Sequence, residues 1–269
     1  MKKFTLVTVL MLLSVLAFAQ KPVRFGVYLG GTVPTGDLGL GDAIIKTEEN
    51  PLGNLSNWAM FDENGKQGYA GIGGSLGFDV TLSLPAGFGV FAGVDVFVNS
   101  NCDDLRGKFS DWATQIEKEV GISSAKFNLP NVWNIPILFG VNYLHNFTNI
   151  VGIWGEVAFG PNFRMISDFK MEIKYTALQT DPETGYDYDV ESITCDYESA
   201  TTFGFKIGGG VMLWNRMSLG IDFYSLGKAK IKGDFEVKEG SHVIGDDVAF
   251  KGKHSMSSSE IVFRVGYHF

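Results

Sequence analysis

Apolar residues alternate with polar or small residues along eight separate segments of this 269-residue chain. Successive side chains of a β-strand point to opposite faces, so each segment predicts a strand with one apolar face and one polar or small face. After residue 19 no uncharged apolar run is long enough for a helical membrane span. The pattern predicts an all-β fold with strands at residues 23–33, 69–84, 88–99, 127–144, 150–165, 201–213, 217–225 and 261–269.

The last predicted strand is apolar on one face up to its final residue. Chain ends fray unless they are held, and a closed sheet holds its last strand by pairing it with the first. A terminal aromatic residue preceded by alternate apolar residues also resembles the signal that the barrel-assembly machinery reads during insertion. We therefore expect that machinery to be an assembly partner, and the expected insertion signal consists of Phe263, Val265, Tyr267 and Phe269.

The connections between the predicted strands alternate between long and short, and the short ones lie at residues 85–87, 145–149 and 214–216. Outer-membrane barrels have this arrangement, with short periplasmic turns and long extracellular loops. We therefore predict a closed antiparallel transmembrane β-barrel of eight strands in the outer membrane of a Gram-negative bacterium. Ten strands are the alternative if the first long segment contains a further pair, and a soluble β-sandwich is the competing fold.

Two aromatic residues on the outward face of the fourth predicted strand support a membrane-spanning height. Trp133 and Tyr143 are ten residues apart, which in a tilted strand corresponds to about 25 Å. That distance matches an apolar belt bordered by aromatic girdles, so outer-membrane lipid is the expected surrounding.

The N-terminus has the pattern of a secretory signal. Lys2 and Lys3 precede an apolar stretch, and Ala17-Phe18-Ala19 forms a small-x-small cleavage site. We assign residues 1–19 to a signal peptide and residues 20–269 to the barrel domain.

The long segments contain structure of their own. Residues 105, 109, 112, 116 and 120 are apolar at helical spacing, which predicts one short amphipathic helix packed over the lumen. Two hairpins are expected to protrude above the membrane, one formed by residues 170–180 and 186–194 and the other by residues 229–237 and 243–250.

Charged residues recur on the inward faces of the predicted strands at similar heights. An eight-stranded barrel has an interior only wide enough for side chains, so these groups are expected to meet as one buried network that plugs the lumen. In this network carboxylates surround Lys206 and Arg264. Arg24 is expected nearer the periplasmic end of the lumen and Arg164 nearer the extracellular end. A proton or solute path is the alternative. The predicted network consists of Arg24, Asp79, Asp95, Glu156, Arg164, Lys206, Asp222 and Arg264.

The sequence contains no strong motif for catalysis, metal binding or nucleic-acid binding. Gly73-Gly74-Ser75-Leu76-Gly77 matches a nucleophile motif, but that motif needs a strand-to-helix elbow and Ser75 is expected within a strand. No pair of His residues has metal-ligand spacing. We predict no catalytic, cofactor or metal site. A net charge of −8 without a basic cluster argues against nucleic acid as a partner.

The two Cys residues, Cys102 and Cys195, are expected on the same side of the membrane. They pass through an oxidising compartment, so one disulfide is possible if their Cα atoms come within about 7 Å. A pair of free thiols is the equal alternative.

Several strand motifs resemble the PorT-like outer-membrane β-barrel family. These motifs are Asn134-Ile135-Pro136-Ile137-Leu138, Phe203-Gly204-Phe205-Lys206-Ile207-Gly208-Gly209-Gly210, Tyr224-Ser225-Leu226-Gly227 and Val265-Gly266-Tyr267-His268-Phe269. The family usually has Gly-Leu after the Tyr-Ser of its seventh strand, where this chain has Leu226-Gly227. The resemblance implies an eight-stranded barrel of OmpA or OmpX size and no catalytic residues. It also implies a link to protein secretion and gliding.

Two classes of function agree with these predictions. In the first, a monomeric barrel anchors acidic, aromatic-containing extracellular loops that bind an unknown protein or surface partner. In the second, the chain is a small channel or transporter, or a component of a secretion apparatus. An enzyme is not predicted.

Overall fold

The computed structural model describes residues 23–39, 70–101, 103–119, 121–182, 185–243 and 248–269. The predicted signal peptide, residues 1–19, lies outside these ranges, as does most of the first long connection. No helix in the described ranges is long and apolar enough to cross a membrane.

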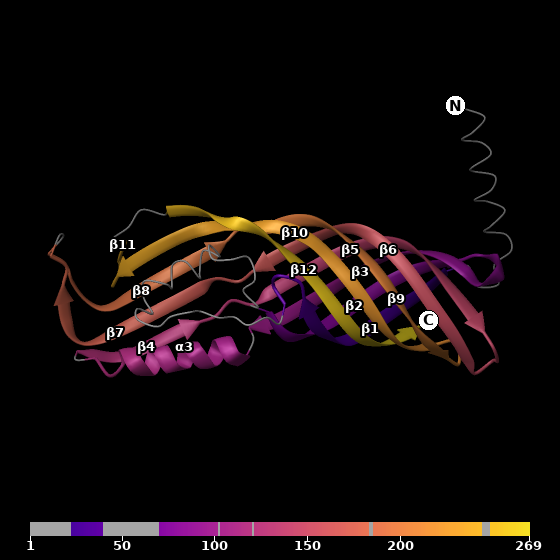
Figure 1. The fold of residues 1–269 in the computed structure, drawn as a ribbon, viewed down its shortest axis with the longest axis horizontal. Helices are drawn as coiled ribbons and strands as arrows, with labels where there is room; N and C mark the ends of the chain where they lie inside the picture. The colour runs from indigo at the N-terminus through magenta and orange to yellow at the C-terminus, as the bar shows by residue number, and fades with distance from the viewer. Residues whose placement is uncertain (1–22, 40–69, 102, 120, 183–184, 244–247) are drawn as a thin grey trace, which may run out of the picture.

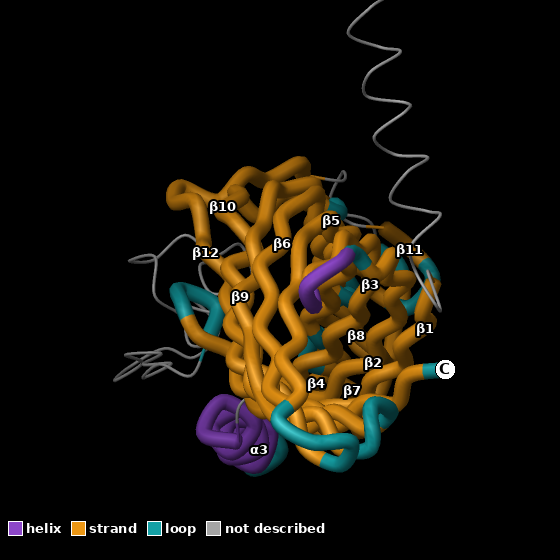
Figure 2. Tube along the Cα trace, turned by 90° about the vertical axis from the view of Figure 1, so that its right-hand side faces the viewer, coloured by secondary structure: helices purple, strands orange, loops and turns teal. Residues whose placement is uncertain are grey.

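Eight antiparallel strands form a ring (Figures 1 and 2). Each strand pairs with its neighbour, and β12 pairs with both β10 and β1, as in the Val27–Tyr267 pair. This ring confirms the prediction of eight strands. Its members are β1 (Val23–Thr35), β2 (Ala70–Ser83), β3 (Phe88–Asn101), β5 (Val132–Asn146), β6 (Val151–Ile166), β9 (Ala200–Leu213), β10 (Met217–Glu239) and β12 (Val248–His268).

Three short connections join ring strands at one end, which we call the short-turn end. The first is a 3-10 turn, η1 (Pro85–Gly87), in which Ala86 has a positive φ of 60°. The second covers residues 147–150, and the third covers residues 214–216 and places Trp214 and Asn215 in the left-handed region. The first and third turns lie where they were predicted, whereas the second is shifted from residues 145–149 because β5 continues to Asn146.

The outer surface of the ring is apolar. Phe25, Leu29 and Phe159 are 54%, 65% and 59% exposed, and the residues between exposed apolar ones are mostly buried. Trp133 and Tyr143 also point outward, as predicted. Soluble monomers rarely expose contiguous apolar patches above a few hundred Å². A belt of this kind around a ring of strands is suited to contact with lipid.

Beyond the ring, β10 and β12 continue into a further part of the same sheet, which we call the extension (Figure 1). In the extension β8 (Asp187–Tyr197) pairs with β10, β7 (Phe169–Thr180) pairs with β8, and β4 (Ile122–Asn128) pairs with β7. The two-residue strand β11 (His242–Val243) also pairs with β10.

The extension corrects two boundaries of the sequence analysis. Strand seven does not end at residue 225, and the hairpin expected at residues 229–237 and 243–250 is not separate, because β10 and β12 run through both regions. A register shift between Ser225 and Lys228 absorbs the interruption at Leu226-Gly227 without ending the pairing. The hairpin expected at residues 170–180 and 186–194 is confirmed as β7 and β8.

The predicted strand at residues 127–144 is in fact two strands. The chain leaves β4 at Asn128 and begins β5 at Val132, and Pro130 lies in the gap, where its missing N–H is no loss. β4 pairs with β7 in the extension, whereas β5 pairs with β3 and β6 in the ring.

Helix α3 (Asp103–Ile116) confirms the predicted amphipathic helix. It contacts β4 and lies beside the extension rather than across the mouth of the ring, which corrects its expected position over the lumen (Figures 1 and 2). Its apolar face supplies part of a buried core shared with the extension and the adjacent rim of the ring. That core consists of Leu38, Ala70, Phe109, Trp112, Ile116, Ala125, Val132, Ile166, Phe169, Met171, Ile173, Cys195, Ile231 and Met256.

Candidate functional site: the charged interior of the ring

Five of the predicted inward charges meet inside the ring, and we call them the inner charge cluster. Lys206 Nζ lies 2.6 Å from Glu156 Oε1, 3.7 Å from Asp222 Oδ2 and 4.0 Å from Asp95 Oδ2. Arg264 approaches Glu156 Oε1 to 2.7 Å through Nη2, and Asp222 Oδ2 to 2.9 Å through Nε. All five residues are at least 91% buried. Each cation therefore contacts more than one carboxylate.

Strand register explains why these charges fit together. Asp222 lies opposite Gly208, and so does Glu156 from the other side, while Asp95 lies opposite Gly77. A Cβ at Gly208 would overlap the Asp222 carboxylate, and one at Gly77 would overlap the Asp95 carboxylate. The inward glycines thus provide the space that the charged side chains occupy.

Aromatic rings enclose the two cations. The Arg264 guanidinium lies 4.4 Å from the Tyr28 ring centre and 4.3 Å from the Trp154 ring centre. Lys206 Nζ lies 5.1 Å from the ring of Tyr224, whose hydroxyl donates a 2.9 Å hydrogen bond to Asp95. Cation–π contacts of this kind add to the ion pairs when the groups are desolvated.

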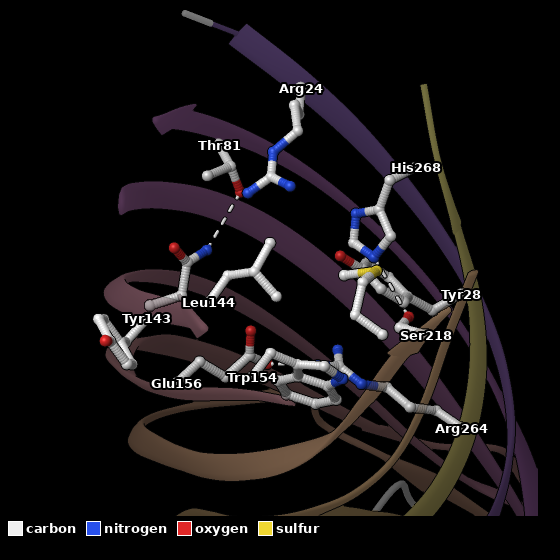
Figure 3. Close-up of a pocket in the computed structure, with 12 residues that line it drawn as sticks. Arg24, Tyr28, Thr81, Tyr143, Leu144, Trp154, Glu156, Ser218, Arg264 and His268 are labelled. Atoms are coloured by element: carbon white, nitrogen blue, oxygen red, sulfur yellow. Dashed lines mark hydrogen bonds and ion pairs between the residues drawn. The ribbon is translucent and has the colours of Figure 1, made fainter. Parts of the chain in front are cut away.

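The other three predicted members lie outside the inner charge cluster, so the eight residues do not form one network of direct contacts. Asp79 accepts a hydrogen bond from Tyr28 and makes no direct ion pair within the described part of the chain. Arg24 lies on the short-turn side of the cluster (Figure 3).

Arg164 belongs to a second polar group nearer the extension. Its Nη1 and Nη2 donate 3.1 Å hydrogen bonds to the carbonyls of Met256 and Gly227. Glu260, which is 1% exposed, accepts a 3.4 Å hydrogen bond from Asn99 nearby in the interior. Residue spacing alone did not separate these groups, because the strands are tilted and staggered around the ring.

Sequence reasoning missed Glu260 and the enclosing aromatics. Glu260 precedes the predicted start of the last strand by one residue, and extending the alternation back from Arg264 would have placed it inward. Tyr28, Trp154 and Tyr224 lie on the same inward faces as the charges, so their positions were also available from the alternation.

The structure also shows where the other residues singled out in the sequence lie. Ser75 lies within β2, opposite Gly30 and Phe97, and not on a strand-to-helix elbow. Cys195 is fully buried in β8, and burial raises the pKa of its thiol to about 12. Cys102 lies outside the described residues, so the disulfide stays a prediction. The four residues of the expected insertion signal are exposed on the outside of β12 and at its end: Phe263, Val265, Tyr267 and Phe269.

No family model and no curated protein matches this sequence. The comparison with solved structures found several outer-membrane proteins with low similarity. A major outer membrane protein from Thermus thermophilus is 15% identical with a TM-score of 0.40, and the match covers 92% of this chain and 99% of that one. Neisserial surface protein A is 10% identical with a TM-score of 0.38, covering 93% and 98%. Ail of Yersinia pestis, solved with the heparin analogue sucrose octasulfate, is 9% identical with a TM-score of 0.35, covering 92% and 99%. Values this low carry no information on function.

The ring itself indicates where the chain resides. Its outside is apolar and its inside is charged, and in lipid only a helix or a ring of paired strands satisfies its backbone hydrogen bonds internally. The chain is an integral protein of the outer membrane, as the sequence analysis predicted.

Proposed function

We propose that the ring is a closed transmembrane β-barrel with a plugged lumen and serves as a membrane anchor for the extension. In this proposal the extension lies outside the cell and binds a protein or surface partner. The chain is proposed to act without catalysis.

The observation that carries this proposal is the inner charge cluster. Its ion pairs of 2.6–2.9 Å join β6, β9, β10 and β12 across the interior, and Lys206 also reaches within 4.0 Å of Asp95 on β3. An eight-stranded barrel is narrow enough for side chains to fill, and these side chains are buried. The filled interior favours the anchor over the small channel or transporter that the sequence analysis left open.

The extension supports the second half of the proposal. It shares a buried core with α3 and the adjacent rim of the ring, and it exposes apolar and aromatic residues at its far tip, among them Leu178 at 67% and Tyr186 at 53%. Tyr186 stacks on His242 with ring centres 4.1 Å apart, which joins the β7–β8 hairpin to β11. The PorT-like motifs in the ring support a related role, in which the partner belongs to a secretion apparatus.

We expect the tip of the β7–β8 hairpin to be required for function and not for folding. Replacing residues 177–187 by a short turn keeps Met171 and Ile173 in the core, whereas a larger deletion from Met171 to Ser192 would remove them. In a deletion strain the trimmed protein should reach the outer membrane at normal yield and fail to complement. The matched control is Lys206→Met/Glu156→Gln, which alters the lumen only and should complement. Full complementation by the trimmed protein, with failure of a folded lumen variant, would contradict the proposal and favour the channel.

A further inference from the structure

A small pocket lies inside the ring between the inner charge cluster and the short-turn end (Figure 3). Trp154, Glu156 and Arg264 form one wall, and Arg24 and Thr81 lie opposite. Asn142, also in the lining, donates a 3.4 Å hydrogen bond to Thr81. Its volume is about 30 Å³, whereas one water needs roughly 10–15 Å³ of such volume. The pocket therefore has room for about two oxygen-sized atoms.

Three hydrogen-bond donors around this pocket have no partner among the described residues. They are Arg24 Nε, Trp154 Nε1 and Arg264 Nη1, and each atom is buried. Trp154 and Arg264 are 91% and 95% buried as whole residues. A buried donor without a partner is costly, so an occupant with acceptor atoms would be stabilised by satisfying these donors.

The carboxylate in the lining of this pocket is already paired with cations. Among the described residues, Glu156 is the only carboxylate side chain in the lining, and its Oε1 already faces Lys206 and Arg264 at 2.6 and 2.7 Å. Asp79 does not line the pocket. Its Oδ2 accepts the hydrogen bond of the Tyr28 hydroxyl, while its Oδ1 is buried without a partner among the described residues. An occupant must therefore bring its own acceptors, and two Arg residues favour an anion.

The pocket adjoins a wider mouth at the short-turn end. Both cavities share Arg24, Leu144 and His268, and the mouth measures about 720 Å³. Arg216 is a further cation in its lining, which contains no Asp or Glu side chain from the described part of the chain. In a chain of net charge −8 this end is locally basic. The two Arg residues outnumber the α-carboxylate of Phe269, which also lines the mouth, so an excess of positive charge remains. Such an excess raises the local concentration of anions.

We propose that this pocket binds the carboxylate group of a small organic anion. The two carboxylate oxygens fit the available volume and accept hydrogen bonds from Arg24, Trp154 and Arg264, while the carbon body lies in the mouth. The site is a dead end, because the inner charge cluster closes it. It therefore goes beyond the anchor role and is independent of any partner at the extension.

The test follows the indole N–H signals of the refolded full-length protein in detergent, with ¹⁵N-labelled Trp. Trp154→Phe assigns the Trp154 signal among the five Trp residues. Sodium acetate is titrated at constant ionic strength, with chloride as the balancing anion. A saturable shift of the Trp154 signal is expected. Arg24→Gln should weaken acetate binding roughly tenfold, because it removes one charged hydrogen bond. Arg106→Gln, which makes the same charge change on α3, should leave binding unchanged.

Three results would overturn the proposal. A shift that grows linearly with acetate and is the same in Arg24→Gln would mean that the donors are only hydrated. If Arg24→Gln and Arg106→Gln weaken acetate binding equally, the net charge of the protein and not a specific contact would explain the effect. A saturable response to inorganic phosphate without one to acetate would exclude a carboxylate site. If Arg24→Gln does not fold, Arg216→Gln tests the mouth and should weaken binding several-fold.

Discussion

Lys206→Met is expected to destabilise the folded ring by about 3–5 kcal/mol, because it leaves buried carboxylates without their cation. The structure identifies the carboxylates that would lose their cation. Lys206 is within 4.0 Å of Asp95, Glu156 and Asp222. Among the described residues, its removal leaves Arg264 as the only cation in direct contact with Glu156 and Asp222, and leaves Asp95 without an ion pair. Urea unfolding in lipid, followed by the heat-modifiable shift on gels, measures the loss.

The control is the double variant Lys206→Met/Glu156→Gln, in which the net charge of the inner charge cluster is the same as in the natural protein. Arg264 then keeps its 2.9 Å pairing with Asp222. The double variant should be less destabilised than the sum of the two single variants by more than about 1 kcal/mol, since contacting groups couple. Additive effects of the two changes would mean that the charges are separately hydrated.

Phe269→Asp is expected to abolish most of the folded protein in the outer membrane. Phe269 follows the strand that closes the ring, donates its backbone N–H to the Phe25 carbonyl at 2.9 Å and contacts the Tyr267 ring at 5.0 Å. Its side chain is 68% exposed on the outer surface, where a carboxylate would face the lipid interface. We expect the chain to fail insertion and accumulate unfolded in the periplasm, which cell fractionation and heat-modifiable migration would show.

Phe147→Asp is the matched control for that variant. Phe147 is 61% exposed at the short-turn end but lies in the turn between β5 and β6, outside the closing strand. Its replacement should leave yield and migration close to normal. Equal losses from both substitutions would show that any acid at this rim is harmful, and the assigned role of the C-terminal strand would then fail.

Alternation was sufficient to predict the ring. Eight strands, their outward faces and the three short turns followed from the period-two pattern, because lipid contact and a filled interior impose opposite requirements on successive residues. The same pattern did not predict the extension. There β10 continues past Leu226-Gly227 through a register shift, and β4 pairs with a strand that follows it by some forty residues. Pairing between distant segments leaves no local signal in the sequence.

The sequence was sufficient to predict which charged residues face the interior of the ring. It was not sufficient to predict which of them contact one another. Residue counts along each strand placed the charges inside the ring, but only the register shows that Lys206, Glu156, Asp222, Asp95 and Arg264 meet, while Arg164 bonds to carbonyls elsewhere. The pocket depends on side-chain directions: Trp154 and Tyr28 stack on Arg264 and leave its Nη1 without a partner among the described residues. Composition and spacing do not contain that information.

The central claim is a ring that spans the outer membrane and carries its extension outside the cell. Cysteine labelling of intact cells with a membrane-impermeant maleimide tests it most directly, in a background where both native Cys residues are replaced by Ala. Leu178→Cys lies on exposed β7 of the extension, and Asn215→Cys lies in a short turn at the opposite end. We expect labelling of Leu178→Cys in intact cells, and of Asn215→Cys only after the outer membrane is permeabilised. Labelling of Asn215→Cys alone in intact cells, or of both residues equally, would contradict the claim.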